Sequence, residues 1–210
     1  MIQLIKKIAV ACVPALLLAS CTKEPLNNLS NEESRIYTTN YDPAVNFGDF
    51  KTYSISDSAT LIDNGVPYKV LADIDIAYMN AVDTYMQQRG YLKVSKDENP
   101  DIGININRIY STVTGVIDNS TYWDYYGGYW DPYYWGYGGY GYGDPYGYGV
   151  YSYTSGAESV DMLDLKNAAV KGKIDIVWTG LVRGEGILNT VNADSSVKAL
   201  FDQSPYLQAQ

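Results

Sequence analysis

A long segment rich in tyrosine and glycine, residues 122–153, is the feature that most constrains how this chain can fold. It interleaves tyrosine and tryptophan with glycine and proline, and it shows neither helical nor strand periodicity. Ordering it is unfavourable, because fixing the backbone costs about 1–2 kcal/mol per residue and glycine loses the most freedom. We therefore expect a disordered loop that interrupts a single domain between two of its strands.

Residues 1–20 are typical of a secretory signal peptide. Lys6 and Lys7 precede an apolar run over residues 8–18. This run is shorter than the roughly 20 apolar residues that a membrane-spanning helix needs. It ends in Leu-Ala-Ser-Cys, with the cysteine at position 21. The tetrapeptide resembles the lipobox of bacterial lipoproteins, which implies that the signal peptide is removed and that Cys21 is acylated.

Acylation of Cys21 would attach the chain to a membrane. Each buried methylene contributes about 0.8 kcal/mol, and two or more chains of the palmitate type make a stable anchor. The next residue is Thr22, whereas an aspartate there often retains lipoproteins in the inner membrane, so we expect the outer membrane of the cell envelope. The polar residues 21–34 would form a lipidated tether, and residues 35–205 a single domain.

Charge and composition exclude several functions. Removal of residues 1–20 takes away two lysines and no acid, so the net charge of −9 becomes −11. Nucleic acid is therefore not an expected partner, because it requires clustered lysine and arginine. The chain has no histidine, and with Cys12 removed and Cys21 acylated it keeps no free thiol. We expect no metal, no cofactor and no catalytic residue, and hence a protein that is not an enzyme.

The clearest helix is expected from Asp73 to Arg89. Its apolar residues recur at helical spacing and form one stripe that must be buried. This stripe consists of Ile74, Ala77, Tyr78, Ala81, Val82 and Tyr85. Asp73 would cap the first amides, and Gly90 would adopt the left-handed conformation that ends a helix. A shorter helix is expected over residues 193–201.

Apolar alternation and β-branched residues predict several strands. They cover residues 35–40, 50–55, 91–94, 102–113, 160–166 and 173–183. After Ile106 the apolar residues change parity, which suggests a bulge near residues 107–108. In the last strand Ile174, Ile176 and Trp178 would share one face, and the loop before it would make a hairpin turn.

This order of elements predicts an α+β fold, in which helices and strands are segregated. We expect an antiparallel sheet packed against one long helix and a short C-terminal helix. The result would be a two-layer sandwich, with residues 122–153 as a disordered loop outside it.

Four short motifs occur in a characteristic order. They are Phe50-Lys51-Thr52-Tyr53, Arg89-Gly90-Tyr91, Asn99-Pro100-Asp101-Ile102 and Val177-Trp178-Thr179-Gly180. With these motifs the chain resembles the domain-of-unknown-function family 4136, over residues 35–205. The resemblance implies an envelope lipoprotein with a tyrosine- and glycine-rich insert before a late hairpin. It implies no activity, and Thr179 stands where an arginine would be expected.

The insert is the best candidate for a contact surface, because tyrosine and tryptophan offer large area at low entropic cost. The candidate contact residues are Tyr125, Tyr126, Trp130, Tyr134 and Trp135. Three interpretations are open: a loop without a ligand, a surface for another envelope protein, or aromatic faces on which glycan rings stack. Stacking on nucleic acid would need basic residues, which the insert lacks.

Two pairs of aspartates are candidates for other chemistry. Asp73 and Asp75 could hold a cation, but helix capping explains them better. Asp161 and Asp164 are expected to face solvent. The leading hypothesis is therefore a non-enzymatic envelope lipoprotein that binds or scaffolds through its aromatic loop. The alternative is a glycan-acting enzyme with paired carboxylates about 5–10 Å apart, and a purely structural protein would have neither pocket nor ligand.

Overall fold

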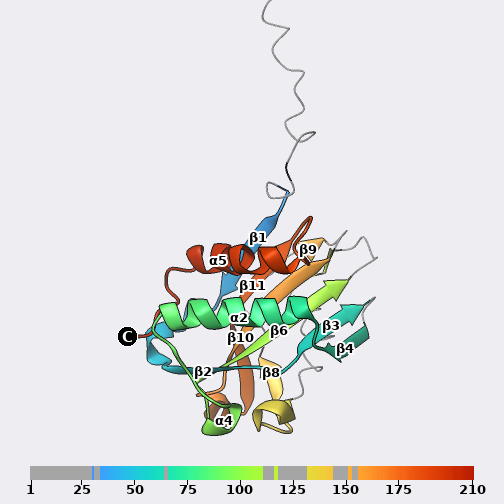
Figure 1. The fold of residues 1–210 in the computed structure, drawn as a ribbon. Helices are drawn as coiled ribbons and strands as arrows, with labels where there is room; N and C mark the ends of the chain where they lie inside the picture. Colours follow the sequence, from blue (N-terminus) through green and yellow to red (C-terminus); the bar gives the residue numbers. More distant parts are fainter. Residues whose placement is uncertain are drawn as a thin grey trace, which may run out of the picture.

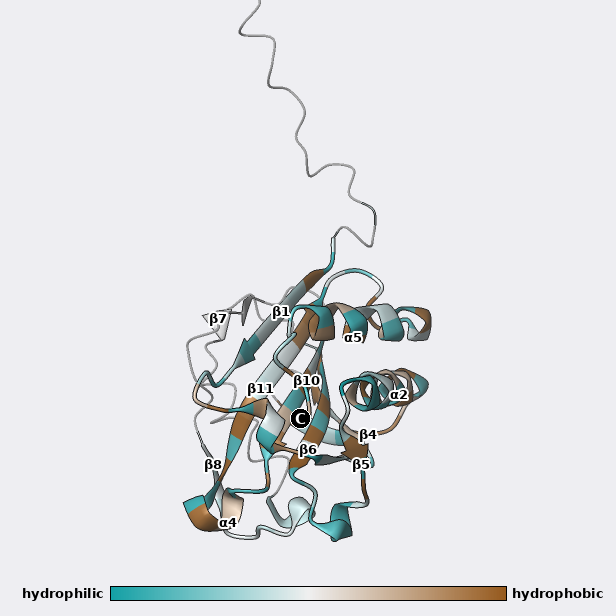
Figure 2. Ribbon diagram, turned by 90° about the vertical axis from the view of Figure 1, so that its left-hand side faces the viewer, coloured by the Kyte–Doolittle hydropathy of each residue, from teal (hydrophilic) through white to brown (hydrophobic). Residues whose placement is uncertain are grey.

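The computed structural model describes residues 30, 34–63, 66–110, 116–117, 132–143, 151–152 and 156–210. Within them, helices α2 (Asp73–Gln88) and α5 (Ala193–Asp202) pack on the same face of a mixed sheet (Figures 1 and 2). A single turn, α4 (Ala168–Lys171), lies at the opposite end of the domain from the start of the first strand (Figure 1). None of the helices described is long and apolar enough to cross a membrane.

Nine of the described strands form this sheet. Their bounds are β1 (Ile36–Tyr41), β2 (Thr52–Ile55), β3 (Ala59–Asp63), β4 (Val66–Val70), β5 (Leu92–Lys93), β6 (Ile102–Tyr110), β8 (Gly141–Gly143), β10 (Ala157–Asp164) and β11 (Lys173–Arg183). Short 3-10 turns are η1 (Phe47–Asp49), η2 (Lys96–Glu98), η3 (Pro132–Trp135) and η4 (Thr190–Asn192), and β7 (Val116–Ile117) pairs with β9 (Tyr151–Ser152) in a second sheet.

The strand order is β1-β11-β10-β6-β2-β5, with β3 beside the far end of β6 and β4 beside β3. The predicted antiparallel pairing holds for β1, β11, β10 and β6. It is wrong for β2 and β3, which run parallel to β6, and for β5 and β8, which run parallel to β2 and β11. The parallel pairing follows from the connection, because the chain passes through α2 between β2 and β6 and returns in the same direction.

Helix α2 confirms the expected stripe, of which Ile74, Tyr78 and Val82 are buried. Its C-terminus also forms as predicted: Gly90 has φ of +87°, and the N–H of Tyr91 donates to the Met86 carbonyl at 3.1 Å. The predicted cap is wrong, because Ala72 is the N-cap residue and Asp73 is already helical. The Asp75 carboxylate accepts from the Ala72 N–H at 2.7 Å and satisfies that amide instead.

The two long strands differ from the prediction in where they are irregular. The pairing of β6 with β10 is regular throughout, so no bulge lies at residues 107–108 and Ile109 simply faces the other side from Ile106. The irregularity is in β11, where the register with β10 shifts between Met162 and Leu163. Val177 is the extra residue, and therefore Ile176 and Trp178 point to opposite faces of the sheet.

The sheet consequently has a hydrophobic core on each face. On the helix side, Ile102, Ile104, Val160, Met162 and Trp178 pack against α2 and α5. On the second face, the buried residues are Ile62, Ile109, Trp135, Ala157, Leu163, Leu165, Ala168, Ile174, Ile176 and Leu181. A two-layer sandwich was the expectation, and the second core requires a further covering segment.

Part of the tyrosine- and glycine-rich insert is that segment. We call residues 132–143 the aromatic cover; it consists of η3, a turn and β8. It is attached to the sheet because β8 pairs with residues 173–175 and the Tyr137 hydroxyl donates to the Leu165 carbonyl at 2.8 Å. The prediction of a wholly disordered loop is therefore wrong for these residues, since tertiary contacts offset the entropic cost of ordering them.

Residues of the four sequence motifs form hydrogen bonds that connect neighbouring secondary-structure elements. The Asp101 carboxylate accepts from the N–H groups of Lys51 and Thr52 at 2.6 and 3.3 Å, and the Asp101 N–H donates to the Thr52 hydroxyl at 2.9 Å. These bonds align the start of β2 with the start of β6. At the end of α2, the Arg89 guanidinium donates to the Phe201 carbonyl at 2.7 Å and so holds the end of α5.

Replacing Asp101 with alanine should lower the free energy of unfolding by about 2–3 kcal/mol, because two N–H groups lose a charged acceptor. Asp101→Asn keeps one acceptor oxygen and should cost about half as much. Urea titration at neutral pH measures both variants. Equal losses in the two variants would show that the carboxylate does not align the strands.

Candidate functional site

A pocket of about 630 Å³ lies at the end of the domain that carries α4. It is formed by the segment around η1, by the corner between β10 and β11, and by Gln210. The segment is shaped locally: the Asp42 carboxylate accepts from the Ala44 N–H at 2.9 Å, and the Asn46 side chain accepts from the Gly48 N–H at 3.2 Å. The charged side chains that line the pocket thus come from segments far apart in the sequence.

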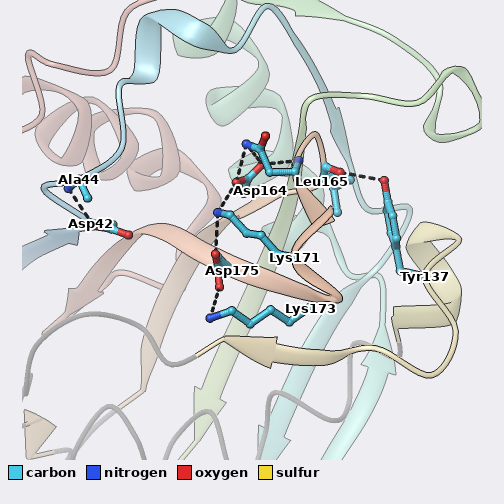
Figure 3. Close-up of polar contacts among 9 residues, drawn as sticks. Asp42, Ala44, Tyr137, Asp164, Leu165, Lys171, Lys173 and Asp175 are labelled. Atoms are coloured by element: carbon cyan, nitrogen blue, oxygen red, sulfur yellow. Dashed lines mark hydrogen bonds and ion pairs between the residues drawn. The ribbon is translucent and has the colours of Figure 1, made fainter. Parts of the chain in front are cut away.

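Asp164 and Lys171 line one wall of the pocket and are part of a chain of ion pairs (Figure 3). The Lys171 ammonium contacts Asp164 at 3.0 Å and Asp175 at 2.7 Å, and Lys173 contacts Asp175 at 2.9 Å. Burial opposes the charges, but the neighbouring lysines lower the pKa of Asp175 and the two carboxylates raise the pKa of Lys171. Both shifts favour the ionised forms of Asp175 and Lys171, which suits a structural role for this pair.

The other lysines of the pocket are held by backbone carbonyls. The Lys166 ammonium donates to the Asp49 carbonyl at 2.5 Å, and the Lys51 ammonium donates to the carbonyls of Gly48 and Gln210. Such fixed cations can attract an anionic group. Asp164, the buried carboxylate of this pocket, is occupied by Lys171 and Asn167, so it is not placed for proton transfer to a ligand.

The two predicted pairs of aspartates do not form catalytic pairs. Asp73 is exposed and Asp75 is buried beneath α2. Asp161 and Asp164 do not face solvent as expected, because both are buried. They also point to opposite faces of the sheet, since they are three residues apart in a regularly paired part of β10.

A buried acidic cluster that the sequence did not suggest lies between α2 and the sheet. Glu158 on β10 has no hydrogen-bond partner at either carboxyl oxygen, and Arg108 contacts Asp75 at 3.4 Å. Burial and the charge of Asp75 raise the pKa of Glu158, which Arg108 partly opposes. Both acids are fully buried, so this pair does not provide the open cleft that a glycan-acting enzyme requires.

The second face of the sheet holds another buried acid, Asp161. One of its oxygens accepts from the Asn107 amide at 2.5 Å and from the Ser159 hydroxyl at 3.4 Å. Burial raises the pKa of Asp161 to about 7, although the nearby Thr179, Asn107 and Ser159 side chains lower it. Alternation with Val160 and Met162 made this position resemble a solvent-facing one, and a second covering layer was not foreseen.

The candidate aromatic contact residues fall into two groups. Tyr125, Tyr126 and Trp130 lie outside the described residues. Tyr134 is half-buried: its hydroxyl accepts from the Asp57 N–H at 2.9 Å, and the ammonium groups of Lys69 and Lys96 lie 5.1 and 4.7 Å from its ring. Trp135 is only 6% exposed and packs into the second core, so its ring contacts the domain itself.

The exposed aromatic residue of the cover is Tyr133, with 72% of its surface accessible. Sequence reasoning did not single it out, because nothing distinguishes it from the tyrosines around it. Its position follows from Pro132 and the 3-10 turn, which direct Tyr133 outward and Trp135 inward.

These features define a class of protein: a mixed α/β domain in which helices cover one face of the sheet and an aromatic segment covers the other. The chain belongs to the DUF4136 family, described as a domain of unknown function, whose sequence profile matches residues 37–206. The family named from the sequence motifs is thereby confirmed.

A solved structure is similar to this fold. It is the crystal structure, at 1.60 Å resolution, of a DUF4136 family protein from Bacteroides thetaiotaomicron VPI-5482. The TM-score is 0.69 and the sequence identity 32%, over 84% of this chain and 99% of that chain. No curated protein matches the chain.

Proposed function

We propose that this protein is a non-enzymatic lipoprotein of the cell envelope, anchored by acylated Cys21 in the outer membrane, that binds an envelope partner through its aromatic segment. The observation that carries the proposal is the position of the aromatic cover. The domain begins at Ile36, which pairs with Arg183 at one end of β11, whereas β8 pairs with residues 173–175 at the other. At about 3.3 Å per residue these ends are roughly 30 Å apart.

A surface at that end is well placed for a partner. A tether attached through residues 21–34 would hold the start of β1 toward the lipid, and the cover would then face away from the membrane. Tyr133 offers a large, stiff side chain there, which favours protein or glycan contact over an anionic nucleic acid. The net charge of the chain supports the same preference.

The anchor is tested by replacing Cys21 with serine and fractionating cells. The protein should move from the membrane to the soluble fraction, because acyl chains supply the binding free energy. Cys12→Ser, within the signal peptide, is the matched control and should leave the protein on the membrane. A Cys21→Ser protein that still sediments entirely with membranes would refute the anchor.

The contact surface is tested by photo-crosslinking in intact cells. A photo-reactive amino acid at position 133 should give a crosslinked product larger than the monomer. The control position is 191 in η4, since Val191 is 78% exposed but lies away from the aromatic cover. Absence of crosslinks at 133, or the same products from both positions, would contradict the proposal.

A further inference from the structure

The pocket beside α4 plays no part in the proposed function, yet its size suits a small molecule. Its volume of about 630 Å³ falls within the roughly 300–1,000 Å³ that ligand sites in proteins usually occupy. The lining comes from residues 44–51, residues 164–171 and Gln210. It includes three lysines and two aspartates, so the balance of these charges determines which class of molecule the pocket can hold.

One part of the pocket wall is electrically balanced. The Lys171 ammonium contacts both Asp164 and Asp175, and Lys173 also contacts Asp175 (Figure 3). Two ammonium groups thus face two carboxylates, which leaves this network without net charge. A charged ligand would gain little from these groups, because each already has a partner of opposite charge.

The charges of Lys51 and Lys166 are not balanced in this way. The Lys166 ammonium donates to the Asp49 carbonyl at 2.5 Å. The Lys51 ammonium donates to backbone oxygens, those of Gly48 and Gln210. Among the residues that the structure describes, neither lysine has a carboxylate side chain within ion-pair distance. An ammonium carries three N–H donors, so both lysines keep donors that a ligand can use.

The charge that opposes these two lysines is the Asp49 carboxylate. Asp49 is exposed, and one of its oxygens accepts from the Asn46 side-chain amide at 3.0 Å. Outside the balanced network, the lining therefore has two ammonium groups and one carboxylate. This local surplus of positive charge contrasts with the net charge of −9 of the whole chain. A concave site with such a surplus attracts anions.

We propose that this pocket binds a small molecule with a carboxylate or phosphate group, which Lys166 and Lys51 hold by charge-assisted hydrogen bonds. Backbone oxygens of another segment already position both ammonium groups, which reduces the entropic cost of binding. Lipid headgroups also carry phosphate, but the pocket lies at the opposite end of the domain from the start of β1 (Figure 1). A free molecule is therefore the expected ligand. This site is separate from Tyr133 and does not depend on the lipid anchor.

The test is isothermal titration calorimetry of the full chain with inorganic phosphate, D-glucose 6-phosphate, citrate and L-glutamate. At least one of these anions should bind, and sodium chloride should weaken its binding, because salt screens the attraction. Lys166→Met removes the ammonium but keeps an apolar side chain, and it should weaken binding about tenfold. Asp49→Asn removes the opposing carboxylate and should tighten binding severalfold, which a loss of structure would not do.

Lys198→Met is the matched control, because it removes the same charge from α5, outside the pocket. It should leave binding unchanged, and D-glucose, which lacks the phosphate, should not bind. The proposal is overturned if none of the four anions binds, if D-glucose binds as tightly as its phosphate ester, or if Lys166→Met and Lys198→Met have equal effects.

Phosphatidylglycerol vesicles distinguish a lipid headgroup from a free anion. If vesicles bind through Lys166 and no soluble anion binds, the pocket recognises lipid and the proposal is overturned. Soluble anions that bind and are displaced by none of the vesicles support it. Crosslinking at position 133 does not depend on any of these results, so the two proposals fail separately.

Discussion

Replacing Trp178 with alanine should lower the free energy of unfolding by about 3–5 kcal/mol, the largest loss we expect from a single substitution in this domain. Trp178 is fully buried, and the centroid of its ring lies 5.9 Å from the ring centroid of Phe201 on α5. Its indole N–H donates to the Ser204 hydroxyl at 2.9 Å. Gly180 allows this packing, because a Cβ there would lie 2.4 Å from the Trp178 ring.

Ser204→Ala separates the contribution of packing from that of the hydrogen bond. It removes the hydroxyl that accepts from the indole N–H and should cost about 1–3 kcal/mol. Denaturant titrations of both variants give the comparison, provided that the slope of free energy against denaturant is unchanged. If Trp178→Ala cost no more than Ser204→Ala, the ring would not be the main link between β11 and α5.

The second large effect concerns pH. Asp161→Asn should change the pH dependence of stability by about 4 kcal/mol between pH 3 and pH 8, because one pKa unit corresponds to about 1.4 kcal/mol. In the folded protein burial raises the pKa of Asp161 to about 7, from an ordinary value of 3.8. A raised pKa means that the folded state holds the proton more tightly. The stabilisation is therefore complete below the unfolded pKa and is lost as the pH rises through 7.

Equilibrium unfolding of both proteins from pH 3 to pH 8 tests this. The unchanged chain should lose more stability than the variant as the pH rises over this range, and the difference between the two should level off above pH 7. Glu158 contributes a slope of the same sign in both proteins, since burial raises its pKa too. The measured quantity is therefore the difference between the curves, and parallel curves would show that Asp161 does not titrate with a raised pKa.

The elements that were predictable are those set by local pattern. The stripe on α2, the left-handed Gly90 and the strand over residues 173–183 follow from periodicity and from glycine, and each is present. Trp178 was expected on this strand, where the structure buries it and the Ser204 hydroxyl accepts from its N–H. The motifs also identified the family. Two of their residues connect elements of this fold: Asp101 links the start of β2 to the start of β6, and Arg89 links the end of α2 to the end of α5.

The features that were missed depend on contacts between distant segments. The hairpin of β3 and β4 carries no strong signal in the sequence, and it joins the sheet because β3 also pairs with β6. Burial of Asp161 requires a layer on the second face, and that layer includes a segment whose composition predicts disorder. The candidate contact residues illustrate the same limit: Trp135 is in the core, whereas the adjacent Tyr133 is exposed, and composition does not distinguish them.

The extra residue at Val177 has a mechanical consequence. Before it, β11 contributes Ile176 to the core of the second face; after it, the strand contributes Trp178 to the core beneath the helices. The strand β11 thus contributes side chains to two hydrophobic cores. The extra residue allows Ile176 and Trp178 each to face the core in which it is buried. Any shift of β11 along its axis would disturb both layers together, so the position of the aromatic cover and that of α5 are mechanically linked.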